Sequence, residues 1–397
     1  MPSDGQVAAT RPNLLTPDPR EEKEDHMNRI RFTSLWLFAF VALLVLAGPL
    51  QAAPPRYVFQ DLGVLPNCDG SSVYAVNNLG QVAGYGLQAY PLDSYDRAFL
   101  KNYGQPMQDL GTLGGNYACA RGINNAGQVA GWSEVDASLW NDHAFLKNPG
   151  QPMVTLGTLG GDESRAYGIN DAGQVVGYAQ DGLGNVRPFL KSPGQDMEDL
   201  GGQSYNPYGE ALSINSAGQV VGQSYKLVVS PTGWLVPGNR RAFLKSPGEV
   251  MVDLDTLGGD ESRASAINHA GQVVGDAENG AGVRLAFLKN PGEAMQALQT
   301  PAPYTGSAAW AINRRGQIVG SAYLSAAPYT HPVLWDQGIM YNLNDLTVNL
   351  PFPEALWYAT GINDQGWITV MTRYSSGAGL LIPVGDSSPA IQLLLLD

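Results

Sequence analysis

The chain has 397 residues, of which 36 are acidic and 23 basic, giving a formal net charge of −13. This balance provides no electrostatic footprint for nucleic acid and argues against a phosphate-binding function. With 48 glycines, 27 prolines and only 15% charged residues, the composition favours a turn-rich all-β protein over a helical or disordered one.

Residues 27–53 have the pattern of a secretory signal peptide. Arg29 and Arg31 precede an apolar run at 35–48, and small residues follow at 52 and 53. The run is short for a bilayer-spanning helix, and no other segment is apolar enough to span one. We therefore expect a secreted or extracellular protein, with the periplasm or cell surface as alternatives, and no membrane span after cleavage. Polar residues 1–26 precede Met27 and are expected to be a leader outside the fold.

Residues 54–397 repeat one pattern, (I/V)-N-x-x-G-(Q/W)-(V/I), and are expected to form a single domain. The asparagines are separated successively by 47, 46, 45, 53, 45 and 50 positions. A period of this length indicates a repeat architecture. The seven asparagines are Asn77, Asn124, Asn170, Asn215, Asn268, Asn313 and Asn363.

Each copy contains four short segments with strand character, exemplified in the third copy by 166–170, 174–177, 188–191 and 197–200. They are rich in β-branched or aromatic residues and are bounded by Gly, Pro or Asn, which is typical of strands. Four strands per 45–50 residues correspond to one propeller blade. The sequence thus predicts a monomeric seven-bladed β-propeller of four-stranded antiparallel blades. We label the strands of each blade A to D from the centre outward.

The connections between these strands read as hairpin turns. Asn170-Asp171-Ala172-Gly173 fits a type I turn in which the asparagine bonds within the turn and Gly173 takes a left-handed conformation. In the C–D connection at 191–195, proline presets φ and glycine supplies the reversal. The recurring letters are therefore interpreted as scaffold.

Two segments are candidates to close the ring. Residues 59–63 (FQDLG) precede the first A strand yet match 107–111 (MQDLG), so they read as a D strand displaced to the N-terminal side. The rival is 391–394, which resembles 295–298. We favour the N-terminal strand, because it runs directly into the first A strand as every other D strand does, and closure removes an exposed sheet edge.

The third strands carry a recognisable motif. One copy spells His-Ala-Phe-Leu at 143–146, and related versions occur at 97–100, 187–190, 241–244 and 285–288. Together with the D-L-G-T-L-G-G-like stretches and the I-N-x-x-G-Q-V-V-G segments, the unit resembles the HAF-repeat family of bacterial extracellular proteins. The resemblance implies an exported bacterial repeat protein and brings no established activity or catalytic residues. The motif weakens at 331–334 and 379–382.

Aromatic residues recur in the segments that we assign to the B–C loops. Variable loops on a rigid scaffold are frequent binding sites, and aromatics within a polar rim suit stacking on sugars or anchoring a protein partner. The alternative for each is packing between blades. The candidate ligand contacts are Tyr85, Trp132, Trp140, Tyr178, Tyr225, Trp234 and Tyr323.

Acidic residues recur in the predicted D–A loops on the same face. Such carboxylates are able to hold Ca²⁺ or to act as an acid–base pair. The competing interpretation is that Arg165 and Arg263 form ordinary ion pairs with these acids or with neighbours of these acids. No cofactor other than Ca²⁺ is suggested. The acidic candidates at the channel mouth are Asp162, Glu163, Glu210, Asp260 and Glu261.

Cys68 and Cys119 are the only cysteines. Export would permit a disulfide between neighbouring repeats, but their offsets from the repeat pattern differ, so two buried thiols are an equal alternative.

No metal-hydrolase, serine-hydrolase or P-loop motif occurs in the sequence. The pattern therefore favours a non-enzymatic binding module for a protein or carbohydrate ligand, with the ligand face formed by the B–C and D–A loops. Two alternatives stay open, namely an extracellular glycan-active enzyme that uses the carboxylates and a purely structural surface or matrix protein.

Overall fold

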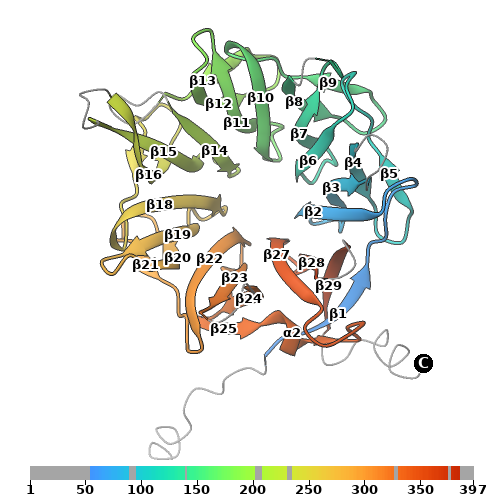
Figure 1. Cartoon of the computed structure of the whole chain (residues 1–397), viewed down its shortest axis with the longest axis vertical. Coiled ribbons are helices and arrows are strands. Elements are labelled where there is room, and N and C mark those ends of the chain that lie inside the picture. Colours follow the sequence, from blue (N-terminus) through green and yellow to red (C-terminus); the bar gives the residue numbers. More distant parts are fainter. Residues whose placement is uncertain are drawn as a thin grey trace, which may run out of the picture. The chain divides into compact units, whose positions relative to one another are not determined.

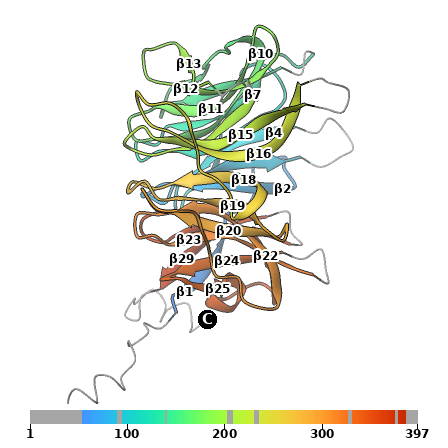
Figure 2. The same cartoon turned by 90° about the vertical axis from the view of Figure 1, so that its left-hand side faces the viewer.

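The computed structural model describes residues 54–88, 95–138, 141–201, 208–229, 235–325, 330–373 and 377–384. The chain divides into two compact units, Met1–Pro54 and Pro55–Asp397, and all described strands belong to the second. That unit is a ring of seven antiparallel blades around a central axis, as predicted (Figure 1). Figure 2 shows the same ring from its side.

The first three blades each contain four strands in sequence order from the centre outward. Blade 1 consists of β2 (Gly70–Val76), β3 (Val82–Leu87), β4 (Asp96–Lys101) and β5 (Met107–Asp109). Blade 2 consists of β6 (Ala118–Ile123), β7 (Val129–Glu134), β8 (Asp142–Lys147) and β9 (Met153–Thr155). Blade 3 consists of β10 (Gly160–Ile169), β11 (Val175–Asp181), β12 (Val186–Lys191) and β13 (Met197–Asp199).

Blades 4 to 6 follow the same order. Blade 4 consists of β14 (Gly209–Ile214), β15 (Val220–Val229), β16 (Leu235–Lys245) and β17 (Val252–Asp253). Blade 5 consists of β18 (Gly258–Ile267), β19 (Val273–Asn279), β20 (Arg284–Lys289) and β21 (Gln296–Ala297). Blade 6 consists of β22 (Tyr304–Ile312), β23 (Ile318–Leu324), β24 (Thr330–Asp336) and β25 (Ile339–Asn342).

Blade 7 combines both ends of the described chain. Its inner strands β27 (Leu356–Ile362), β28 (Ile368–Thr372) and β29 (Ala378–Val384) are completed by β1 (Arg56–Asp61), which runs antiparallel to β29 from Arg56↔Val384 to Asp61↔Gly379. The prediction of closure by the N-terminal strand is confirmed. The rival segment, 391–394, lies outside the described residues. Figure 1 shows β1 beside β29 at the junction of the two ends.

One short segment after blade 6 was not predicted. It forms the helix α2 (Leu343–Leu346) and the strand β26 (Thr347–Val348), which pairs in parallel with β1 as a fifth strand of blade 7. Within the described ranges no helix is long and apolar enough to cross a membrane.

The A–B turns have the predicted geometry. Asn170 Oδ1 accepts hydrogen bonds from the backbone N–H groups of Ala172 (3.1 Å) and Gln174 (3.0 Å), and Gly173 has φ of +74°. The left-handed region favours glycine because it has no Cβ. The local sequence therefore determines the turn.

The same asparagines also join the blades, which was not predicted. Each Nδ2 donates a hydrogen bond of 2.9–3.1 Å to the backbone carbonyl of the equivalent asparagine in the next blade. The last bond runs from Asn363 to the carbonyl of Asn77 and completes a closed circuit of buried side chains. We call this circuit the asparagine ring.

Phenylalanines of the third strands fill the core. Phe99, Phe145, Phe189, Phe243 and Phe287 are completely buried, and the cluster around Phe145 includes Ala83 and Ala98 of the preceding blade. Burial of one such side chain stabilises a fold by roughly 1.5–3 kcal/mol. The recurring phenylalanine is thus explained by packing between blades.

Replacement of one ring asparagine is expected to destabilise the whole propeller. Asn170→Ala removes the buried hydrogen bond to the Asn215 carbonyl, which keeps its bond from the Gly218 N–H, and the two part-buried bonds that Oδ1 accepts from Ala172 and Gln174. Intramolecular hydrogen bonds contribute roughly 0.5–1.5 kcal/mol each, so we expect a loss of roughly 2–4 kcal/mol in the free energy of unfolding measured with urea.

Asp171→Ala is the matched control, because Asp171 is the next residue of the same turn and is exposed. We expect it to cost about 1 kcal/mol or less. Equal losses for the two variants would contradict the role assigned to the asparagine.

Candidate functional site

The innermost strand of every blade places one side chain in the channel three residues before the asparagine. These residues differ from copy to copy and all line one cavity of about 300 Å³. They are Tyr74, Arg121, Tyr167, Leu212, Ser265, Trp310 and Thr360. The volume lies at the lower end of the range for small-molecule sites. We call this cavity the wide-mouth cavity.

The residue directly before the asparagine is, by contrast, Val76 in the first blade and isoleucine in the other six. These side chains form an apolar waist in the middle of the channel. The repeat therefore keeps the residue before the asparagine nearly constant and varies the residue three places before it, which lines the wide-mouth cavity.

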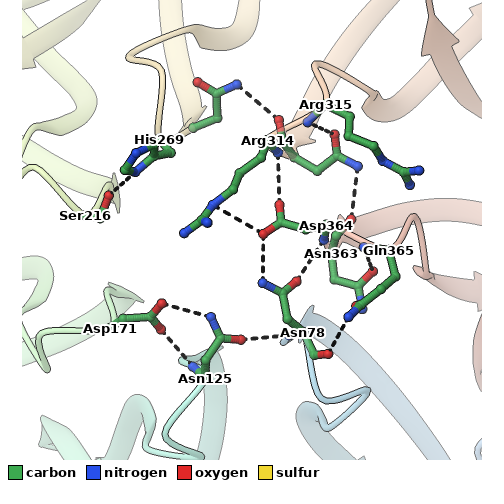
Figure 3. Close-up of polar contacts among 12 residues, drawn as sticks. Asn78, Asn125, Asp171, Ser216, His269, Arg314, Arg315, Asn363, Asp364 and Gln365 are labelled. Atoms are coloured by element: carbon green, nitrogen blue, oxygen red, sulfur yellow. Dashed lines mark hydrogen bonds and ion pairs between the residues drawn. The ribbon is translucent and has the colours of Figure 1, made fainter.

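Polar residues directly after each asparagine surround the opposite end of the channel. We call them the collar: Asn78, Asn125, Asp171, Ser216, His269, Arg314 and Asp364. Figure 3 shows that their side chains bind one another.

The collar bonds run from blade to blade. Asn78 Nδ2 donates to Asp364 (2.7 Å), Asn125 Nδ2 donates to Asp171 (2.9 Å), and Ser216 Oγ contacts His269 Nδ1. Because the collar residues bind each other, many of their hydrogen-bond donors and acceptors already have partners within the protein. This agrees with the interpretation of the A–B turns as scaffold.

Arg121 projects into the wide-mouth cavity between two tyrosines. Its guanidinium carbon lies 3.8 Å from the ring centroid of Tyr74 and 5.4 Å from that of Tyr167. Cation–π contacts of this kind hold the guanidinium in place without neutralising its charge. In the described part of the chain, no carboxylate forms an ion pair with Arg121.

Arg263 enters the same cavity from β18. Its guanidinium carbon lies 5.2 Å from the ring centroid of Trp310, and its buried Nε has no hydrogen-bond partner among the described residues. Burial lowers the pKa of Arg263, and the like charges of Arg240 and Arg121 add to this effect, whereas the carboxylates of Asp276 and Glu210 oppose it. Arg263 is therefore a largely buried cation without an ion pair in the described ranges.

The five aromatic candidates within the described ranges lie on the second strands, so their expected position in B–C loops is wrong. Tyr85 on β3 stacks on Tyr74 with centroids 5.9 Å apart, and Tyr178 on β11 packs against Tyr167 at 6.0 Å. These strands extend further than the sequence suggested, because polar and aromatic residues alternate to their ends. The second-strand tyrosines support channel residues from behind.

The remaining aromatic candidates have different surroundings. Trp132 on β7 lies 4.6 Å below the guanidinium of Arg165, while Tyr225 on β15 and Tyr323 on β23 are half-buried. Trp140 and Trp234 lie outside the described residues.

The acidic candidates begin the innermost strands, so their placement in D–A loops is also wrong. Asp162 and Glu163 belong to β10, and the equivalent Asp260 and Glu261 belong to β18, because both strands already begin at the first of the two glycines that precede these acids. Glu210 lies on β14.

Most of these carboxylates are engaged or exposed. Glu261 is paired with Arg284 (2.7 Å) and Arg240 (3.5 Å), and Glu210 accepts a hydrogen bond from Gln223 (2.8 Å). Asp162 and Asp260 are exposed, and Glu163 accepts a bond from Gln180 at 3.4 Å.

The arginines expected to pair with these acids do not do so. Arg165 pairs with Asp142 of the neighbouring blade, whereas Arg263 has no ion pair within the described ranges. Across the part of the chain that the structure describes, no group of three His, Cys, Asp or Glu side chains is arranged to hold a metal ion.

The two cysteines are separate buried thiols rather than a disulfide. Cys68 packs with Leu62 and Leu65 outside β2, and Cys119 lies on β6. Burial raises the pKa of Cys119 to about 12.

The sequence reasoning missed the residues that line the cavity. Arg121, Arg263 and Trp310 were not candidates, because the sequence pattern predicted the binding residues in the B–C and D–A loops rather than on the innermost strands. A signal for two of them was present, since the position three residues before the asparagine differs in every blade except for the tyrosines at 74 and 167.

No family model matches the sequence, and no curated protein matches it. Solved structures with a similar fold include the acylaminoacyl peptidase of Pyrococcus horikoshii, 10% identical, with a TM-score of 0.50. That match covers 82% of this chain and 54% of the peptidase chain.

Two bacterial proteins give comparable matches. A gluconolactonase from Xanthomonas campestris is 11% identical over 85% of this chain and 99% of its own, with a TM-score of 0.39. TolB from Acinetobacter baumannii is 12% identical over 77% and 80%, also with a TM-score of 0.39. At such identities the likeness concerns the propeller fold alone.

The burial of both thiols predicts slow alkylation of the folded protein. Because a thiolate is the reactive form and burial raises the pKa of both cysteines, iodoacetamide at mildly alkaline pH should leave native protein unmodified. In concentrated guanidinium chloride without reductant, mass spectrometry should find both thiols alkylated. Unfolded protein that resists alkylation until a reductant is added would instead reveal a disulfide.

Proposed function

We propose that this propeller is a non-enzymatic binding module and that its ligand enters the wide-mouth cavity. The observation that carries the proposal is the presence of two arginines, Arg121 and Arg263, in one cavity of about 300 Å³, neither in an ion pair within the described residues.

The two ends of the channel differ in how many of their polar groups are hydrogen-bonded within the protein. Collar residues such as Asn125 and Asp171 bind each other. At the wide mouth, Arg263 Nε and Ser265 Oγ are buried without a partner in the described chain. Buried polar groups are nearly always hydrogen-bonded, so an exception at a cavity wall supports a missing partner.

The aromatic lining supports the same conclusion. Trp310 is held by a hydrogen bond from Nε1 to Ser321 Oγ (3.1 Å), and Tyr358 lies against Trp357 with centroids 4.7 Å apart. Rigid aromatic side chains lose little entropy on binding and often dominate binding energy. The cavity thus combines fixed aromatic surfaces with unpaired cations.

A glycan-active enzyme receives less support from the site. Catalysis of that kind needs two carboxylates that face each other across one sugar. Glu261 is instead held by two arginines, and Asp260 is exposed at the start of its strand. No observation favours this second function over binding.

We further propose that the protein is exported and belongs to the HAF-repeat family, from the sequence patterns above. Export predicts that protein isolated from its native cells begins close to residue 54 and is found outside the cytoplasm. N-terminal sequencing of that protein tests this, and an intact 27–53 segment on a cytoplasmic protein would contradict it.

The binding proposal predicts that lumen variants lose ligand while folding normally. The probe is a panel of immobilised neutral and acidic oligosaccharides, with affinities of hits measured in solution. Trp310→Leu and Arg121→Gln should each weaken binding by roughly tenfold or more, because both remove a contact at the cavity.

Tyr103→Leu serves as the aromatic control, because Tyr103 is exposed in a C–D turn on the collar side, against Trp367. It should leave affinity unchanged, and circular dichroism should show native spectra for all variants. An empty panel, or unchanged affinity in both lumen variants, would overturn the proposal.

A further inference from the structure

We propose that the wide-mouth cavity binds the end of an acidic glycan, with the carboxylate of a terminal uronic acid residue held by Arg263 and Arg121. This inference rests on the proposed binding function and names the chemical class of the ligand. It is argued from charge, unused hydrogen-bond donors and the shape of the cavity.

The first argument is electrostatic. Arg121 lies on β6 and Arg263 on β18, three blades apart, yet they line the same cavity and the charge of one is felt by the other. Like charges in a partly desolvated space repel, and their cost is relieved by a bound anion. A carboxylate between them would supply the direct ion-pair partner that neither arginine has among the described side chains.

The second argument concerns hydrogen bonding. Arg263 Nε and Ser265 Oγ are buried without partners in the described ranges, two residues apart on the same strand. A guanidinium presents its donors in a planar fork that matches a carboxylate, and such charge-assisted bonds are stronger than neutral ones. Both atoms are covered by neighbouring protein, so the groups of Arg263 left for a ligand are the remaining donors of its guanidinium.

Arg165 provides an internal comparison. It occupies on β10 the position equivalent to Arg263, five residues before the asparagine. Each guanidinium lies over a tryptophan, that of Arg165 over Trp132 of the preceding blade and that of Arg263 over Trp310 of the following blade. Arg165 is neutralised by Asp142 of the adjacent blade, and its buried Nε, like that of Arg263, has no hydrogen-bond partner in the described ranges, so the two arginines differ in the ion pair rather than at Nε. The carboxylate that the protein itself supplies to Arg165 is missing at Arg263, which indicates the chemistry of the absent partner.

The third argument identifies the rest of the ligand. Beside the two arginines, the cavity wall presents the rings of Trp310 and Tyr358 and the hydroxyl-bearing Thr360. Aromatic surfaces beside polar groups suit the apolar faces and hydroxyls of a sugar ring. A bare inorganic anion would leave the aromatic part of the cavity unused.

The net charge of the protein favours the end of a glycan over a long polyanion as the ligand. With a net charge of −13, the exterior repels an extended acidic polymer, whereas the cavity concentrates positive charge at one point. A single terminal residue is able to reach the two arginines without covering the acidic surface.

The test compares acidic sugars with uncharged analogues of the same shape. Glucuronic acid and galacturonic acid, each against its primary amide, are titrated into the full protein by calorimetry, with sulfate and phosphate as free-anion arms. We expect at least one acid to bind at least tenfold more tightly than its amide, and more tightly than either inorganic anion.

Two variants of Arg263 test its position. Arg263→Gln should reduce the preference for the acid over the amide to less than about threefold, and Arg263→Lys should restore only part of it, because lysine lacks the fork. Arg187→Gln is the matched control, because Arg187 pairs with Asp199 on an outer strand; it should keep the full preference.

The outcomes separate this inference from the function on which it rests. Equal binding of acid and amide, with loss of both in Trp310→Leu, would overturn the carboxylate and leave the binding module intact. Binding of sulfate or phosphate as tight as that of the sugar acid would overturn the sugar. If Arg263→Gln misfolds, Arg121→Gln must reduce the preference instead, and an unchanged preference there would overturn the inference.

Discussion

The hydrogen bond from each ring asparagine to the carbonyl of the next is the interaction on which the rest of the structure depends. The side chain of Asn170 closes its own turn through Oδ1 and holds the following blade through Nδ2. The bond from Nδ2 to the next blade is buried, so water does not readily replace it and its loss costs more than that of a surface bond. Because the circuit returns from Asn363 to Asn77, it joins the last blade to the first independently of β1. The ring therefore fixes the distance of every inner strand from the axis.

This constraint separates the scaffold from the site within a single strand. The residue that precedes the asparagine is always Val or Ile and packs at the waist, whereas the residue three places before the asparagine lines the wide-mouth cavity. The asparagine ring and the interblade phenylalanines already stabilise the fold. The positions that line the wide-mouth cavity therefore accommodate Leu212 or Ser265 as readily as Arg121. Their chemistry is free to serve a ligand.

Much of the fold was predictable because its signals are local or periodic. The Asn170–Gly173 turn, four strands per period and the D-strand resemblance of 59–63 led to the correct ring. The bonds between asparagines escaped prediction because they join residues about one repeat apart. Asp162 and Tyr85 were placed in loops because polar strand ends resemble loops in sequence. Arg165 pairs with Asp142, whereas Arg263 has no ion pair in the described chain. This difference depends on how side chains are placed in space, which a single sequence does not reveal.

If the asparagine ring couples the blades, the turns that form it should open together. Hydrogen–deuterium exchange, followed by mass spectrometry on peptides that cover the seven A–B turns, measures this directly. The hydrogen-bonded amides that donate to the asparagines, such as that of Gln174, are predicted to exchange at one common slow rate with the same dependence on denaturant, as expected for a single cooperative unit. Separate rates for individual blades, with some turns opening far below the global free energy of unfolding, would contradict the account.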